Sequence, residues 1–366
     1  MTIILKPTYA CNFRCRYCYL SNNTKLHTHR LDVELIKGVV LQLKEILSSS
    51  PVKRTISFIW HGGEPLLWGK ENYRQALDFI TVHLKDFGVK NSIQTNLSLI
   101  DEEYLDIFSR YNVKIGFSLD GDKVINDGQR LGFNGEPTYD IIMEKLSLCR
   151  NKGFSPGCIV VGSRKHIGRI PLLYQFMRTH NLNFKFNPLF IAGEAGHNID
   201  EYSITADEYA DMSIELFDLW FNDREGKIQE SNFIEIASNI ATNHVAGCMF
   251  KQNCQDSFMA ITPYGEVMPC GRFCDEEFEK YSYGNLYEKS LSEILQGVKS
   301  STIYHRAEHI KHSKCADCKW FDICHGGCTH DGFLYSGDFK HKTFLCSAYK
   351  KIFNHIERKM LDSKML

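Results

Sequence analysis

The chain lacks a dominant charge, a membrane-length apolar run and an amino-terminal targeting segment. Its 366 residues carry 43 Lys and Arg against 44 Asp and Glu, without a long block of like charge, so nothing favours a nucleic-acid groove. No stretch reaches the roughly 20 apolar residues of a membrane-spanning helix. The strand-like run Ile3-Ile4-Leu5 opens the sequence, where a signal peptide would show a hydrophobic region and a cleavage site. We therefore expect a cytoplasmic protein without membrane or nucleic-acid partners.

The first half of the chain shows no internal repeat and the sequence has no low-complexity run, whereas cysteine is abundant. There are 14 cysteines, and in a reducing compartment such a number favours metal ligation over disulfides. Three lie near the amino terminus and nine lie between Cys248 and Cys346. The isolated Cys149 and Cys158 are most simply small buried hydrophobic residues. The distribution predicts two metal-binding ends around a cysteine-poor middle.

Short apolar runs alternate with amphipathic segments of helix length over the first half of the chain. Strand and helix repeated about six times predict a parallel sheet with right-handed crossovers that place the helices outside. The pattern alone allows an open sheet or a closed barrel. The expected strands are Ile3–Leu5, Thr55–Trp60, Ser92–Thr95, Val113–Leu119, Gly157–Val161 and Asn183–Phe190, and the expected helices are 32–48, 71–86, 101–110, 138–152 and 167–180.

The second half divides into three parts. Residues 192–247 open on a Gly-rich joint and continue with a helical pattern, so they form a helical linker after a first domain at 1–191. Residues 248–346 are loop-rich, and nine cysteines in about a hundred residues indicate that metal clusters hold this domain together. Residues 347–366 form a terminal helix.

Three cysteines with unequal spacing, Cys11, Cys15 and Cys18, follow the first strand. Closely spaced loop thiolates are the ligands of iron-sulfur cubanes. Three thiolates leave one iron without a protein ligand, and such an open position lets a metal centre bind a small molecule. A zinc knuckle is the plain alternative, although a zinc site normally closes with four protein ligands.

The motif CxxxCxxC, with Tyr17 just before its last cysteine, resembles the signature of the radical S-adenosylmethionine (SAM) superfamily. The resemblance implies a [4Fe-4S] cluster that binds SAM at its open iron and yields a 5′-deoxyadenosyl radical, which takes hydrogen from a C–H bond. It also implies an α/β fold, a partial (β/α)6 TIM-like barrel with its active site at the carboxyl ends of the strands.

Further positions match the SAM-binding elements of this superfamily. His61-Gly62-Gly63-Glu64-Pro65 resembles its GGE motif, where a tight turn with an exposed Glu is the alternative. Polar residues at Gln94-Thr95-Asn96 and Ser118-Leu119-Asp120-Gly121 end two strands, where side chains usually face the ligand. The alternative for Arg130 is a solvated loop arginine. By the resemblance, the SAM-binding residues are Tyr17, Gly62, Gly63, Glu64, Ser118, Arg130, Asn187 and Leu189.

A second cysteine pattern fills the carboxyl-terminal third and resembles the twin-cluster SPASM domain of peptide-modifying and protein-modifying radical SAM enzymes. Eight thiolates are enough to saturate two cubanes, which gives three [4Fe-4S] clusters in all. A zinc ribbon is the alternative for the closely spaced Cys315, Cys318, Cys324 and Cys328. The resemblance assigns Cys248, Cys254, Cys270 and Cys328 to one auxiliary cluster and Cys315, Cys318, Cys324 and Cys346 to the other.

Two departures from the sulfatase-maturating pattern guide the expected function. In those enzymes an aspartate follows the Gly-x4-Cys cysteine and serves as a base, whereas this chain has Gly271; it also has His61 where they carry Gln. We therefore expect a peptide maturase that installs a C–C or thioether crosslink on a ribosomally made precursor peptide. The alternative is an anaerobic sulfatase-maturating enzyme that forms formylglycine with Asp256, Asp275 or His61 as a substitute base. A remote alternative is an iron-sulfur electron carrier.

The remaining expectations concern catalysis and partners. The candidate catalytic residues are His61, Cys274 and Asp275, of which Cys274 is a spare thiol, an alternative ligand or a residue facing the substrate. The partners are a precursor peptide or protein substrate and an external electron donor such as flavodoxin or ferredoxin. Because the chain opens almost directly on the barrel, we expect no leader-binding domain in front of it.

Overall fold

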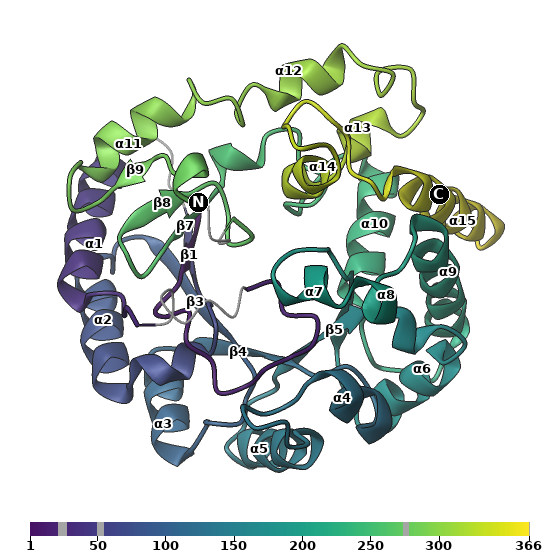
Figure 1. Cartoon of the computed structure of the whole chain (residues 1–366), viewed down its shortest axis with the longest axis horizontal. Coiled ribbons are helices and arrows are strands. Elements are labelled where there is room, and N and C mark those ends of the chain that lie inside the picture. The colour runs from purple at the N-terminus through teal and green to yellow at the C-terminus, as the bar shows by residue number, and fades with distance from the viewer. Residues whose placement is uncertain (21–27, 50–54, 274–277, 366) are drawn as a thin grey trace. The chain divides into compact units, whose positions relative to one another are not determined.

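A computed structural model describes residues 1–20, 28–49, 55–273 and 278–365 of the chain (Figure 1). The chain divides into two compact units, each assembled from segments that are far apart in the sequence. The first unit comprises residues 1–118, 130–156 and 255–301, and the second comprises 119–129, 157–254 and 302–366. No helix in the described ranges has both the length and the apolar character needed to cross a membrane.

The first unit is built on parallel strands that alternate with helices, as the sequence predicted. Figure 1 shows α1, α2 and α3 outside the strands that they connect. Leu5 pairs with Trp60, and Trp60 pairs with Ile93, so the carboxyl ends of β1, β2 and β3 lie along one edge. The elements are β1 (Thr2–Leu5), α1 (Val33–Ser48), β2 (Thr55–Trp60), the 3-10 helix η2 (Pro65–Trp68), α2 (Lys70–His83), β3 (Gly88–Thr95), α3 (Glu102–Arg110), β4 (Val113–Ser118) and α5 (Tyr139–Asn151).

Three further strands extend this sheet beyond β1, and the sequence did not predict them. β7 (Phe258–Ile261) runs parallel to β1, while β8 (Glu266–Met268) and β9 (Gly284–Asn285) are antiparallel. α11 (Leu291–Val298) follows, and its Leu291 amide donates to Gln42 Oε1 of α1 at 2.6 Å. Residues from the expected cysteine-rich domain therefore belong to the same sheet as the first strand.

A buried aromatic group fixes the helices behind the loop that follows β2. The Trp60 and Trp68 rings lie 5.4 Å apart, and Tyr73 meets Trp68 at 5.1 Å. Aromatic residues bury the largest apolar area per side chain and favour such edge contacts. This group supports η2, which directly follows Glu64.

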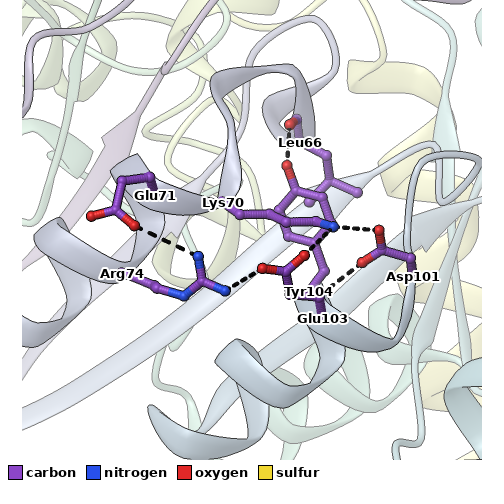
Figure 2. A network of polar contacts seen from close by, with 7 residues as sticks. All are labelled: Leu66, Lys70, Glu71, Arg74, Asp101, Glu103 and Tyr104. Atoms are coloured by element: carbon purple, nitrogen blue, oxygen red, sulfur yellow. Dashed lines mark hydrogen bonds and ion pairs between the residues drawn. The ribbon is translucent and has the colours of Figure 1, made fainter.

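A polar network joins α2 to α3 next to this core (Figure 2). Lys70 Nζ contacts Asp101 Oδ2 at 2.5 Å and Glu103 Oε2 at 2.7 Å, and Arg74 contacts Glu71 and Glu103. These charges are largely exposed to solvent, so the ion pairs contribute little to stability. The buried bond from the Tyr104 hydroxyl to the Leu66 carbonyl, 2.5 Å, is the part that anchors η2 to α3.

The second unit contains two parallel strands and a group of long helices. Val161 of β5 pairs with Asn187 of β6. A capping box of Thr205 and Glu208 begins α9, and α15 packs against α9 and α10. Figure 1 shows these three helices side by side. The main elements are α4 (Lys123–Gln129), β5 (Gly157–Gly162), α6 (Ile170–Thr179), β6 (Phe184–Pro188), α9 (Ala206–Asn222), α10 (Ser231–Thr242), α12 (Arg306–Lys311), α13 (Phe321–Cys324), α14 (Thr329–Ser336) and α15 (Cys346–Asp362), with short helices α7 (Glu194–His197) and α8 (Ile199–Tyr202).

Candidate functional site

The first cysteine loop leaves the carboxyl end of β1 and gathers its three thiols in one place. The Phe13 amide donates to Cys11 Sγ at 3.3 Å, and the Cys18 amide donates to the Cys15 carbonyl at 3.1 Å. Burial, followed by Glu64 and the neighbouring Cys15 thiol, raises the pKa of Cys11 well above its usual value. Three neighbouring thiolates repel one another and are stable only with a cation among them, so the loop fits an iron-sulfur cluster.

The glycines of the second loop pack against the backbone of the cysteine loop. A Cβ at Gly62 would lie 2.3 Å from the Thr8 carbonyl oxygen, and one at Gly63 would lie 2.3 Å from that of Ala10. This close approach lets the Gly63 amide donate to Thr8 at 3.0 Å and the Glu64 amide donate to Ala10 at 2.8 Å. Any side chain at either glycine would push the two loops apart.

Glu64 braces the site from within. Its carboxylate accepts hydrogen bonds from Thr95 Oγ1 at 2.7 Å, the Asn96 amide at 2.7 Å and the Leu66 amide at 2.9 Å. Burial raises the Glu64 pKa to about 7, although these bonds oppose the shift. Asn96 Nδ2 in turn lies 3.8 Å from Cys11 Sγ. The alternative of an exposed turn glutamate is therefore wrong, because Glu64 connects the end of β3 to the first cysteine.

Arg130 and Tyr17 form a second brace in the first unit. Arg130 is 7% exposed and donates through Nη1 to the Tyr17 hydroxyl, so the alternative of a solvated arginine is wrong. A buried guanidinium beside the cysteine loop suits a carboxylate ligand. Gln94 Nε2 donates to Ser118 Oγ at 3.0 Å, which holds that hydroxyl at the end of β4. The SAM contacts of these residues stay predictions.

His61 lies at the end of β2 beside Tyr19, whose hydroxyl is 3.4 Å from His61 Nδ1. Burial and the charge of Lys6 lower the pKa of His61 to about 4, so the ring is neutral near pH 7. The other two candidate catalytic residues, Cys274 and Asp275, lie outside the described residues.

The second unit holds the remaining predicted SAM contacts, Asn187 of β6 and the buried Leu189. Asn187 Oδ1 is buried without a hydrogen-bond partner among the described residues. Because an unpartnered buried acceptor is unfavourable, this atom suits a ligand that donates a hydrogen bond. The adenine contact predicted for both residues stays a prediction.

Four cysteines of the second unit line one pocket. Cys324 ends α13 and Cys346 begins α15. Burial and the nearby thiols of Cys346, Cys315 and Cys318 raise the Cys324 pKa to about 12. The four thiols meet the ligand requirement of a saturated cubane. The pocket residues are Lys314, Cys315, Cys318, Trp320, Phe321, Cys324, Gly326, Lys342, Thr343, Cys346, Tyr349, Lys350 and Phe353.

The other predicted auxiliary set is divided between the units. Cys270 follows β8 in the first unit, whereas Cys248, Cys254 and Cys328 belong to the second, and their shared cluster stays a prediction. The turn between Cys324 and Cys328 has positive φ at three successive residues, His325 (47°), Gly326 (79°) and Gly327 (72°). Glycine adopts this left-handed backbone without steric strain.

Comparison with known proteins identifies the family. The radical SAM superfamily model matches residues 5–164, and the SPASM model of an iron-sulfur cluster-binding domain matches residues 248–319. The chain belongs to the radical SAM superfamily. This radical SAM enzyme uses SAM and [4Fe-4S] clusters, one that binds SAM and two auxiliary ones.

Relatives match the radical SAM enzyme over nearly its whole length. The cysteine-type anaerobic sulfatase-maturating enzyme of Clostridium novyi is 26% identical over 96% of this chain and 94% of its own. The serine-type enzyme of Bacteroides thetaiotaomicron is 23% identical over 97% and 89%. The structure of anSMEcpe with bound AdoMet and Cp18Cys peptide superimposes with a TM-score of 0.85, 22% identity and coverage of 99% and 98%. The predicted fold class, a partial (β/α)6 barrel with a SPASM domain, is confirmed.

The expectation of a crosslink-forming peptide maturase is wrong. Sulfatase-maturating enzymes of both the cysteine and the serine type match almost the entire chain. The expectation depended on Gly271 and His61, the two positions where this chain departs from the sulfatase-maturating pattern. A missing side chain at one loop position does not decide the product, because a neighbouring element can supply another polar group. Here an ideal Cβ at Gly271 would lie 3.7 Å from Lys6 Cε.

The zinc and electron-carrier alternatives are also set aside. The second matching family model describes an iron-sulfur cluster-binding domain, which favours iron over zinc at these cysteines. The superfamily assignment makes the chain an enzyme rather than a carrier.

Sequence reasoning missed several contacts around the sites. It named Asn96 as a polar residue at the end of a strand but did not predict that its side chain contacts Cys11. Lys6 and Arg306 carried no sequence signal, because buried and exposed cations look alike in a sequence. In the second unit, Asp120 Oδ2 accepts from Gln129 at 2.9 Å, and Gln129 Oε1 accepts from Ser163 at 2.8 Å. This buried network joins the loop after β4 to the end of β5.

Proposed function

We propose that this radical SAM enzyme is an anaerobic sulfatase-maturating enzyme, which oxidises a cysteine or serine side chain of a protein substrate to formylglycine. The observation that carries the proposal is the similarity to the Clostridium novyi enzyme over 96% of this chain and 94% of that enzyme. A relative of matching length leaves no large segment of the known enzyme without a counterpart. A flavodoxin or ferredoxin is the proposed electron donor.

The residues of the first unit hold the reacting groups in this proposal. Cys11, Cys15 and Cys18 ligate the cluster, and Arg130 is placed to bind the SAM carboxylate. When bound, SAM and the clusters supply a radical that takes a hydrogen atom from the substrate carbon and an acceptor for the remaining electron. Glu64 keeps the end of β3 against the cysteine loop through its bonds to Thr95 and Asn96.

The residues of the second unit protect the other metal site. Trp320, Phe321 and Phe353 give the pocket of the four cysteines an apolar lining. Lys314 and Lys342 line the same pocket, where positive charge offsets the negative charge of a thiolate-bound cluster. This arrangement supports an electron acceptor that remains bound during turnover.

The test uses anaerobically reconstituted enzyme with SAM, a reductant and a sulfatase-derived peptide that carries one target cysteine or serine. We expect an aldehyde at the target residue, detected by mass spectrometry with fragmentation and by an aldehyde-reactive probe. The control variant is Cys11→Ala, which removes a predicted ligand of the SAM-binding cluster and leaves the peptide unchanged. If the wild-type enzyme cleaves SAM but forms no aldehyde in either peptide, the proposal is wrong.

A further inference from the structure

A buried lysine stands at the carboxyl end of β1. Lys6 is 1% exposed. Its Nζ lies 3.5 Å from the Tyr19 hydroxyl, 5.4 Å from the Tyr9 ring centroid and 5.2 Å from the Tyr19 ring centroid. In the part of the chain that the structure describes, no carboxylate forms an ion pair with this lysine. Aromatic faces offset part of the lost hydration of an ammonium, but they do not neutralise its charge.

His61 lies beside the same tyrosine as Lys6, and its Nδ1 is 3.4 Å from the Tyr19 hydroxyl. The Gly62 amide donates to His61 Nδ1 at 2.6 Å, so Nδ1 is the acceptor of the neutral ring and the proton resides on Nε2. Burial, together with the positive charge of Lys6, lowers the pKa of His61 and keeps the ring neutral. His61 is therefore a hydrogen-bond donor rather than a proton acceptor, which argues against its role as a substitute base.

Glycine at position 271 contributes no acidic side chain beside Lys6. An ideal Cβ at Gly271 would lie 3.3 Å from two atoms of Ile4 and 3.7 Å from Lys6 Cε. An aspartate at this position would therefore place its carboxylate near the Lys6 side chain. We name Lys6, Tyr9, Tyr19, His61 and Gly271 the Lys6 cluster; it offers donors and a charge but no carboxylate. Because a buried charge is stable only when it is paired, the cluster suits an anionic group from a ligand.

We propose that the Lys6 cluster binds the target cysteine of the substrate as its thiolate, which makes this enzyme selective for cysteine over serine. The inference depends on the proposed function and specifies its substrate. On binding, the S–H bond breaks, the proton passes to solvent, and the thiolate pairs with the Lys6 ammonium; no electron moves in this step. A free thiol has a pKa of about 8.5, which one adjacent cation brings to neutrality or below. A serine hydroxyl ionises at a far higher pH, beyond the reach of one ammonium.

The experiment measures binding separately from turnover. Reconstituted enzyme with SAM is titrated calorimetrically, near pH 7, with sulfatase-derived peptides that carry Cys, Ser or Ala at the target position. Parallel titrations in buffers with different ionisation enthalpies give the number of protons released. For the wild-type enzyme we expect release of nearly one proton with the Cys peptide only, and binding of this peptide about tenfold tighter than of the Ser peptide.

Two pairs of variants test the role of Lys6. Lys6→Met should abolish the proton release and the preference for cysteine, whereas Lys37→Met, on the surface of α1 and paired with Glu34, should retain both. Gly271→Asp and Gly271→Asn place side chains of the same shape against Ile4. Only the Asp variant pairs with Lys6, so only it should lose the preference. Iron content and circular dichroism confirm that each variant folds.

The outcomes separate this inference from the proposed function. Proton-free binding of the Cys peptide to the wild-type enzyme, or an unchanged cysteine preference in both Lys6→Met and Gly271→Asp, overturns the inference even if formylglycine is formed. A loss of SAM affinity in Lys6→Met with unchanged peptide binding assigns Lys6 to SAM and also overturns it. Conversely, thiolate binding without aldehyde from any peptide contradicts the proposed function and leaves the anion site intact.

Discussion

The two cysteine sites differ in the number of their thiols and in the side chains around them. The three thiols of the first unit lie on a loop held by polar contacts. The Gly63 backbone amide donates to the Thr8 carbonyl of this loop, and the side-chain amide of Asn96 contacts Cys11. Four thiols in the second unit lie among aromatic rings and lysines. Polar groups beside the first site suit the polar ends of SAM, whereas the second site offers the four thiols of a full ligand set in a partly apolar pocket. The difference is the one expected between an open cluster for chemistry and a closed one for electrons.

Removal of one cysteine from each site should give the largest and most different effects. Cys18→Ala should abolish formation of 5′-deoxyadenosine from SAM, because the open cluster loses a ligand. Cys324→Ala should retain SAM cleavage and lose peptide oxidation. Each variant should bind about four irons fewer than the twelve or so of three cubanes. Iron analysis and chromatography of the nucleoside measure these effects, and SAM cleavage by Cys18→Ala would contradict the assignment.

Two buried carboxylates provide a matched comparison of the units. Glu230 of the second unit accepts hydrogen bonds from the amides of Phe186 at 2.8 Å and Phe233 at 2.6 Å, as Glu64 accepts from its three donors. Either Glu→Ala variant leaves buried donors unpaired, so each should lower the free energy of unfolding by about 3 kcal/mol. Only Glu64→Ala should also slow SAM cleavage at a temperature where both variants are folded. Chemical denaturation and product analysis distinguish the two effects.

The same pair predicts a pH dependence of stability. Burial raises the pKa of both Glu64 and Glu230 to about 7 from 4.5. Between these values the folded state retains protons that the unfolded state has released, so stability falls as pH rises from about 4.5 to about 7. Glu64→Gln and Glu230→Gln should each flatten this slope. A slope that is unchanged in both variants would show that neither carboxyl is protonated in the folded enzyme.

The sequence predicted the alternating elements of the fold because their patterns are local. The run Thr55–Trp60 coincides with β2, and the segment 139–151 of α5 falls within the predicted 138–152. The strands β7 to β9 were missed because they are only two to four residues long. β7 also depends on pairing with β1, more than 250 residues away, and β8 and β9 are added in turn beside β7. Short strands of this kind carry little periodicity of their own.

The candidate site was predictable only where spacing or sequence motifs reveal the chemistry. The spacing of the cysteines predicts metal ligation, and the position of GGE after β2 predicts a SAM-binding loop. Lys6 looks like the end of an apolar run, and its burial arises from Tyr9 and Tyr19 in the loop that follows. The sequence left His61 open as a candidate base. The contact that fixes its tautomer, a hydrogen bond from the Gly62 amide to Nδ1, is shown by no sequence pattern.

A buried arginine allows the auxiliary cysteines of the second unit to be perturbed without loss of a ligand. Arg306 is 2% exposed and donates to the carbonyls of Gly326 at 3.1 Å and His341 at 3.2 Å. Burial lowers its pKa, and the neighbouring thiolates of Cys328 and Cys254 oppose this shift. Arg306→Met removes a positive charge beside these thiolates, so the auxiliary reduction potential should fall by on the order of 50 mV. Spectroscopic redox titration measures it, and an unchanged potential would show that the charge is screened.

The smallest effect should come from the counterpart variant at the first site. Asn96→Ala removes the Nδ2 group that lies 3.8 Å from Cys11 Sγ and that also donates to Asn12 at 2.8 Å. Loss of one weak donor to a cluster sulfur should lower the potential of the SAM-binding cluster by about 20 mV and leave both auxiliary potentials unchanged. Asn96→Asp keeps the shape but replaces the donor with an acceptor, so its shift should be larger and of the same sign. A shift at the auxiliary clusters in either variant would mean that the polar contacts of the first site do not act locally.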